Sequence, residues 1–133
     1  MGKPAAKQSD TVTGIDLHIV LVPSPGGPVP TPLPHPFVGM LDGNLSTNVK
    51  VMGMPAATVG STAQNQPPHI PTPPGTSFQL PPSNTATIRM GSMTVKINGQ
   101  QAARAGDLTE TCADPVPNMS ASLITVGTVL IGG

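Results

Sequence analysis

The segment Gly53-Met54-Pro55-Ala56-Ala57-Thr58-Val59-Gly60-Ser61 decides the fold, because the chain contains two further copies of its pattern. Each copy has a glycine, two other residues, an Ala-Ala pair and a small polar end. The other two copies occupy residues 2–10 and 99–107. Repetition of one short unit indicates a fold built from several copies of a single supersecondary element.

A short β-strand is predicted before two of the three copies. Residues 48–53 and 94–99 carry β-branched side chains at alternate positions, and Asn98-Gly99 is a strong hairpin signal. Each unit is therefore predicted to be a strand, a tight turn and a second strand. The first copy has no preceding strand, but residues 128–133 have the same pattern. We therefore predict that residues 2–9 pair with residues 127–132, so that the two termini complete a third hairpin.

The predicted fold class is all-β: a small cone of three β-hairpins with pseudo-threefold symmetry, closed by pairing of the two termini. Closure removes exposed sheet edges, which an apolar chain needs to avoid aggregation. Residues 19–47 and 62–86 hold most of the 18 prolines and are predicted to be long, stiff Pro/Gly-rich loops. Because no segment shows a period of 3.6, almost no helix is expected. One domain over residues 1–133 is expected.

The composition limits both the partners and the core. Six basic residues balance six acidic ones, and only 9% of the chain is charged, so an electrostatic surface for nucleic acid or an anionic membrane is excluded. With two Phe and no Trp or Tyr, the core is thin. Small domains of this kind usually need a further stabilising element, such as a disulfide, a bound metal or oligomerisation. Cys112 is the only cysteine, which excludes a disulfide within the chain. A metal ion, oligomerisation or a partner protein therefore remains as the source of additional stability.

A metal site is predicted from the rarest residues of the chain. One thiolate and three imidazoles match a tetrahedral zinc site in composition. In the first two repeats a histidine follows the second alanine by twelve residues, and in the third the cysteine follows by nine. The three loops are therefore expected to bring one ligand each to one end of the pseudo-threefold axis, and the longest loop adds a fourth. The predicted ligands are His18, His35, His69 and Cys112.

Catalysis is not supported by the sequence. Four protein ligands close a metal site, whereas a catalytic zinc keeps one position open for water. Glu110 is the only glutamate, and no metal-binding helix motif surrounds it. The chain also lacks a Ser-His-Asp grouping, a phosphate-binding loop and a dinucleotide fingerprint.

Three motifs resemble those of the PAAR-repeat family. They are Pro-Ala-Ala-Lys at residues 4–7, Pro-Ala-Ala-Thr at 55–58 and Gln-Ala-Ala-Arg at 101–104, and none is a perfect Pro-Ala-Ala-Arg. The resemblance implies a β cone that binds and sharpens the blunt tip of a trimeric β-helical spike. Such spikes belong to type VI secretion systems, extracellular injection particles and phage tails. Many relatives carry toxin extensions, and residues 1–133 are expected to form a single domain without an effector extension. It also implies one structural zinc near the vertex, held by His18, His35, His69 and Cys112, with iron as the less favoured metal.

The expected function is therefore a structural, metal-binding cap that helps a spike to pierce a target envelope. It implies one cap per spike trimer, transient contact with the target membrane, and no nucleic-acid or small-molecule substrate. The chain shows no signal peptide, and its longest apolar stretches, residues 15–22 and 123–131, are too short to span a bilayer. Synthesis in the cytoplasm and delivery by the injection machine are expected. The alternatives are a free-standing zinc-binding structural module or adaptor, and a small zinc hydrolase.

Overall fold

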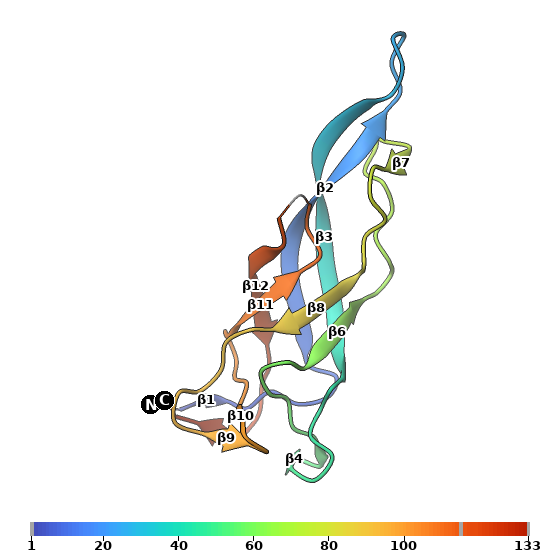
Figure 1. The fold of residues 1–133 in the computed structure, drawn as a ribbon. Coiled ribbons are helices and arrows are strands. Elements are labelled where there is room, and N and C mark those ends of the chain that lie inside the picture. Colours follow the sequence, from blue (N-terminus) through green and yellow to red (C-terminus); the bar gives the residue numbers. More distant parts are fainter. Residues whose placement is uncertain (1, 115, 133) are drawn as a thin grey trace.

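The computed structural model describes residues 2–114 and 116–132, which form thirteen β-strands and, within these ranges, no helix. The all-β prediction is confirmed. The molecule tapers from a wide end, where both termini lie, to a narrow end formed by one long hairpin (Figure 1). No helix of a length and apolarity suited to crossing a membrane occurs in the described ranges.

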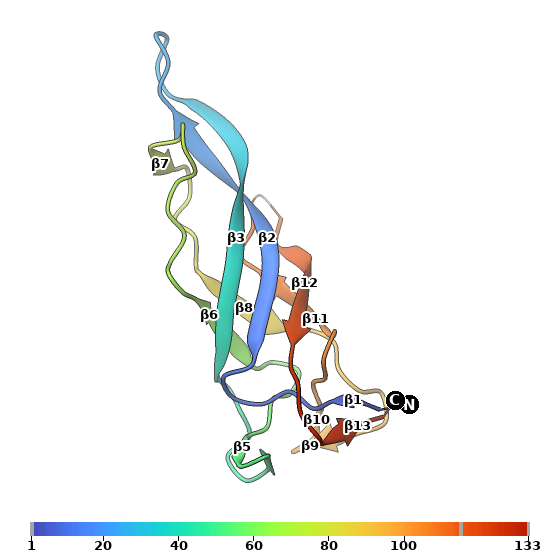
Figure 2. The same ribbon diagram turned by 180° about the vertical axis from the view of Figure 1, so that it is seen from behind.

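Three small hairpins form the wide end, as the repeat predicts. Strand β1 (Lys3–Pro4) pairs with β13 (Leu130–Ile131), β4 (Lys50–Val51) with β5 (Met54–Pro55), and β9 (Lys96–Ile97) with β10 (Gln100–Gln101). Lys3 lies opposite Ile131, so the predicted pairing of the two termini is confirmed. Gly133, the last residue of the predicted closing strand, lies outside the described residues. Figure 2 shows these hairpins from behind.

The turns of two hairpins explain their sequences. Met52-Gly53 and Asn98-Gly99 have positive φ at both residues, with φ of 52° and 83° in the first pair and 53° and 83° in the second. This conformation is the hairpin turn that matches strand twist, and it favours Asn-Gly. The third hairpin needs no turn, because the two ends of the chain meet there.

The three Ala-Ala pairs meet in a closed ring of hydrogen bonds. Ala6 N–H donates to Ala103 O (2.9 Å), Ala103 N–H to Ala57 O (3.1 Å), and Ala57 N–H to Ala6 O (3.0 Å). All six alanines of the three pairs are buried. The ring is the arrangement that a pseudo-threefold axis requires, and the axis itself stays a prediction.

A closed barrel stands above this ring. Its strands are β2 (Thr11–Val22), β3 (Val29–Gly43), β6 (Thr62–Asn65), β8 (Thr85–Ile88), β11 (Leu108–Thr111) and β12 (Asn118–Ile124). They follow the order β12-β11-β8-β6-β3-β2, and β12 pairs with β2 to close the cycle. These strands form three further hairpins, one after each repeat. Strand β7 (Ser77–Phe78) adds to the outer edge of β2.

The predicted loops are in part strands. Residues 19–22 and 29–43 belong to the paired strands β2 and β3, so the loop predicted over 19–47 is wrong for them. The same correction applies to β6, β7 and the start of β8 in the loop predicted over 62–86. The Pro-rich segments 66–76 and 79–84 are outside strands, as predicted.

Strand β3 tolerates its prolines because of their register. Prolines 30, 32, 34 and 36 occupy alternate positions opposite Leu21, Ile19, Leu17 and Ile15 of β2. The carbonyls of the first three of these β2 residues accept hydrogen bonds from Thr76, Gln79 and Asp114 instead of from β3. The proline nitrogens therefore point to the outer edge of β3, where an absent N–H removes no ladder bond.

Two small cores lie on either side of the alanine ring. The first alanine of each pair packs with Val51, Ile97 and Ile131 at the wide end. The second alanine of each pair packs in the barrel with residues such as Phe37 and Ile88. The Ala-Ala dipeptide therefore serves both cores, since successive residues of an extended chain face opposite sides.

Candidate metal centre

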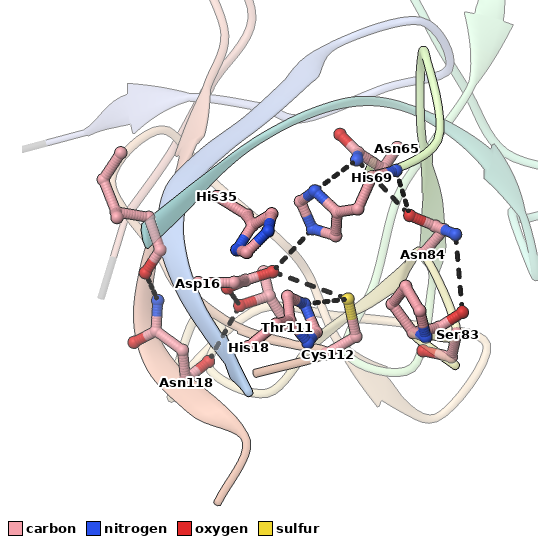
Figure 3. A network of polar contacts seen from close by, with 12 residues as sticks. Asp16, His18, His35, Asn65, His69, Ser83, Asn84, Thr111, Cys112 and Asn118 are labelled. Carbon is pink, nitrogen blue, oxygen red and sulfur yellow. Dashed lines mark hydrogen bonds and ion pairs between the residues drawn. The ribbon is translucent and has the colours of Figure 1, made fainter. Parts of the chain in front are cut away.

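Three of the four predicted ligands meet where the barrel hairpins end. His18 lies on β2, His69 follows β6, and Cys112 follows β11. One ligand atom from each of these residues, and one from Asp16, lie within 4.8 Å of one another. Figure 3 shows the four side chains pointing toward a common centre. The structure thus brings His18, His69 and Cys112 together, and it adds Asp16, which the sequence analysis did not single out.

The strand period explains why Asp16 and His18 share this site. They are two residues apart on β2, so both side chains face the interior. Both residues are fully buried, and the side chain of His69 is only 2% exposed. The alternation of polar residues in an otherwise apolar strand was the available signal for Asp16, since a buried carboxylate needs a partner.

The ring nitrogens that face away from the centre have polar partners. His18 Nδ1 lies 3.1 Å from the Asp114 carboxylate, so it carries the proton and Nε2 faces Cys112. Asn65 Nδ2–H donates to His69 Nδ1 (3.1 Å), so the proton of His69 is on Nε2, which donates to Asp16 Oδ2 (3.3 Å). The contact with Asp114 orients His18 as an outer partner orients an imidazole ligand, whereas His69 would have to release its Nε2 proton before it bound a metal.

The donor atoms are closely spaced. Cys112 Sγ lies 3.5 Å from His18 Nε2 and 3.5 Å from Asp16 Oδ2, and the latter lies 3.3 Å from His69 Nε2. The other carboxylate oxygen of Asp16 accepts a hydrogen bond from the Thr111 hydroxyl.

The electrostatics of the centre differ for its two acidic groups. Burial raises the pKa of Cys112 to about 11. Burial alone would raise the pKa of Asp16 too, but hydrogen bonds from His69, Thr111 and Cys112 outweigh it, so the pKa of Asp16 is lowered. Asp16 is therefore an anion in the interior, and a divalent cation would compensate its charge.

His35 lies beside the centre but outside the group of four. Its ring centroid is 5.3 Å from that of His18 and 5.6 Å from that of His69. Its Nδ1–H donates to Leu33 O (2.9 Å), and its Nε2 accepts from Thr72 N–H (3.1 Å). Burial lowers the pKa of His35, which keeps the ring neutral. Its role as a ligand stays a prediction.

The donor set fits a transition metal. Two imidazoles, a thiol and a carboxylate in a buried position are the ligands that Zn²⁺ prefers. A groove of about 390 Å³ next to His35 and His69, lined by the Pro-rich segment 66–73, opens beside the site. Metal binding at the centre itself would require the Cys112 thiol to lose its proton.

Comparison with known proteins gives one match. A family model for the PAAR motif matches residues 22–118. Neither the curated proteins nor the solved structures include a match to this chain. The matched region contains the second and third Ala-Ala copies and three of the four predicted ligands, and it covers well over half of the sequence. The chain belongs to the PAAR motif family.

Proposed function

We propose that this protein is a metal-stapled structural cap that sits on the tip of a trimeric β-helical spike in a contractile injection apparatus. The observation that carries the proposal is the ring formed by Ala6, Ala57 and Ala103 at the wide end. Three copies of one motif make the same backbone contacts there, so a threefold partner would meet three similar edges. This match in symmetry allows one chain to cap a spike made of three chains.

Exposed apolar side chains support a docking surface at the wide end. Met52 lies in the turn between β4 and β5, Met93 lies just before β9, and Leu130 lies on β13. Each is more than half exposed. Because the chain has few charges, binding through this end would depend on apolar burial and on strand-edge hydrogen bonds.

The narrow end supports a mechanical role. The β2–β3 hairpin continues beyond the barrel, as both ribbon views show (Figures 1 and 2). A tapering end is too thin for a core of its own, so a metal would supply the crosslink between hairpins. His18, His69 and Cys112 come from three different hairpin regions, and a metal would tie them together. The sequence-based proposal completes this set with His35.

The chemistry of the centre supports a structural role rather than catalysis. Four side-chain donors fill a tetrahedral site and leave no position for an activated water. We therefore propose that the protein is not an enzyme. In this proposal it is made in the cytoplasm, assembles at the spike tip, and touches the target membrane only transiently during delivery.

Co-purification with a trimeric spike tests the proposal. The expected product contains one cap per three spike chains, and its affinity changes little between low and moderate salt because few ion pairs are available. Leu130→Asp should abolish binding. Ile15→Asp is the matched control, because Ile15 on β2 is 60% exposed and Leu130 is 59% exposed. Equal loss of binding in both variants, or a steep loss with salt, would contradict the proposal.

A further inference from the structure

We propose that Lys3, Lys50 and Lys96 form a lysine rim at the wide end, and that this rim pairs with three carboxylates on the spike tip, one Asp or Glu side chain from each chain of the trimer. The inference rests on the proposed cap function and names the chemistry of its partner. Lys3 lies on β1, Lys50 on β4 and Lys96 on β9, and all three are exposed. These three strands lie at the wide end, one in each hairpin (Figure 1).

The lysine rim surrounds one small core. Each lysine is next to a different member of the buried cluster at the wide end. The three neighbours are Ile131 opposite Lys3, Val51 after Lys50 and Ile97 after Lys96. Because the three apolar side chains pack in one cluster, the three cations are arranged around a common centre. A partner with three identical chains requires such an arrangement of contacts.

The third hairpin has its lysine at a different position of the repeat. Strands β4, β9 and β13 share an exposed first residue and a buried second residue. The exposed residue is Lys50 in β4 and Lys96 in β9, but it is Leu130 in β13. Lys3 lies instead on β1, the strand that pairs with β13. Each hairpin therefore has one positive charge, although the repeat position that carries it changes.

The other basic residues have acidic partners within the chain. The ion pairs are Lys7–Asp10 (3.0 Å), Arg104–Asp107 (2.9 Å) and Arg89–Glu110 (2.8 Å). Among the residues that the structure describes, Lys3, Lys50 and Lys96 form no ion pair. Half of the basic residues are thus neutralised inside the molecule, and the other half form the lysine rim, where carboxylates of a second molecule can pair with them.

The neutral chain also has an electrical polarity along its length. All six basic residues lie outside the barrel strands. Two of the six acidic residues accompany them, which gives this part a formal net charge of +4, and the other four give the barrel and the metal centre −4. Those four are Asp16, Asp42, Glu110 and Asp114. Acidic groups on a spike tip would therefore attract the wide end and repel the barrel, which orients the cap during encounter.

Three cations fit a trimeric protein better than a polyanion. Nucleic-acid binding with a strong electrostatic term uses about 6–10 phosphate contacts, and a lipid surface has no threefold order to match. An exposed ion pair changes an affinity by only about 1.5–5-fold. Apolar burial therefore still provides most of the affinity for the spike, and the dependence on salt stays shallow. The lysine rim sets the orientation and the rate of association.

Lysine-to-glutamine variants test the assignment against the trimeric spike obtained by co-purification. Rates are measured by biolayer interferometry with the spike immobilised. Lys3→Gln, Lys50→Gln and Lys96→Gln are each expected to weaken binding by about 1.5–5-fold, chiefly through slower association, and the triple variant by roughly 3- to 100-fold. Tm should not change, because the three side chains are exposed. Gln79→Glu is the matched control, since it makes the same change in charge at an exposed residue next to β7, and it should bind like the parent.

Neutralising the spike carboxylates tests the same contacts with an unmodified cap. Carbodiimide and glycinamide convert the carboxylates of the spike to neutral amides. The parent is expected to bind the amidated spike as weakly as the triple variant does, and the triple variant should bind both forms of the spike alike, because the interaction is then already lost. A further equal loss in the triple variant would overturn the assignment.

Two other results would overturn the lysine rim while leaving the cap function intact. One is parental spike binding by the triple variant, and the other is an equal loss in Gln79→Glu and Lys50→Gln. Binding of the parent to phosphatidylserine vesicles that the triple variant loses, without a change in spike binding, would replace the carboxylate partner by a lipid surface. A parent that binds no spike overturns the cap function itself.

Discussion

The backbone N–H of Ala6 donates to the carbonyl of Ala103 across 2.9 Å, although the two residues lie far apart in the sequence. Ala57 completes the ring between them. All three side chains are buried, and each faces the barrel core. Because three backbones converge there, a side chain larger than a methyl group has no space.

Replacing one ring alanine by a larger residue should therefore destabilise the protein. Ala103→Leu is expected to lower the free energy of unfolding by about 1–3 kcal/mol or more, since overpacking forces backbone shifts. Urea denaturation measures the change. Ala105→Leu is the control, because Ala105 is only half-buried, and a change within about 0.5 kcal/mol is expected there. Equal effects at both positions would contradict the role of the ring.

Asp107 should be replaceable by serine but not by alanine. Its carboxylate accepts from Arg104 N–H at 2.7 Å, and at the equivalent position of the second copy the Ser61 hydroxyl accepts from Thr58 N–H at 3.0 Å. Asp107→Ala leaves the part-buried Arg104 N–H unsatisfied and is expected to cost about 1–3 kcal/mol. Asp107→Ser retains an acceptor, so thermal unfolding should show a clearly smaller loss. Identical losses would count against the equivalence of the copies.

Removal of residues 128–133 should destabilise the wide end. The truncation deletes β13, the acceptor of Ala5 N–H at Val129 O (2.8 Å) and the buried side chain of Ile131. Loss of a buried Ile side chain alone costs about 2–5 kcal/mol. Ile131→Val, which keeps the strand, should cost only about 0.5–1.5 kcal/mol. A truncated chain with the Tm of the full chain would refute closure by the termini.

Metal removal should lower thermal stability in a pH-dependent way. Bound metal requires a thiolate and neutral imidazoles, so protons compete with it. The metal-dependent part of the stability is therefore largest at high pH and falls as the pH drops: because burial raises the pKa of the Cys112 thiol to about 11, protons already compete for Sγ at neutral pH, and in acid they compete for the imidazole nitrogens as well. Apparent binding energies of about 10–16 kcal/mol for structural zinc are comparable with a total stability of about 5–15 kcal/mol, so the loss should be large. Tm with and without a chelator, across this pH range, measures it. No chelator effect at high pH would exclude a structural metal.

The features that the sequence predicted correctly depend on local chemistry. Asn98-Gly99 specifies its hairpin turn through two positive φ angles, and the repeat places the matching turn at Met52-Gly53. The pairing of Lys3 with Ile131 followed from a repeat unit whose halves lie at opposite ends of the chain. The absence of a helical period likewise predicted the all-β class. Each of these signals is contained within a few residues or in their repetition.

Only the tertiary structure decided where the prolines of β3 point and which side chains surround the metal centre. Proline argues against a strand locally, and only the register with β2 shows that these nitrogens lie on an outer edge. Asp16 and His35 lie opposite each other on paired strands and both are buried. The Thr72 N–H donates to His35 Nε2, and the Thr111 hydroxyl donates to Asp16. Both threonines come from parts of the chain that are distant from β2 and β3. Hydrogen bonds of this kind depend on how separate segments pack, and spacing along one chain does not encode which atom of a side chain remains free.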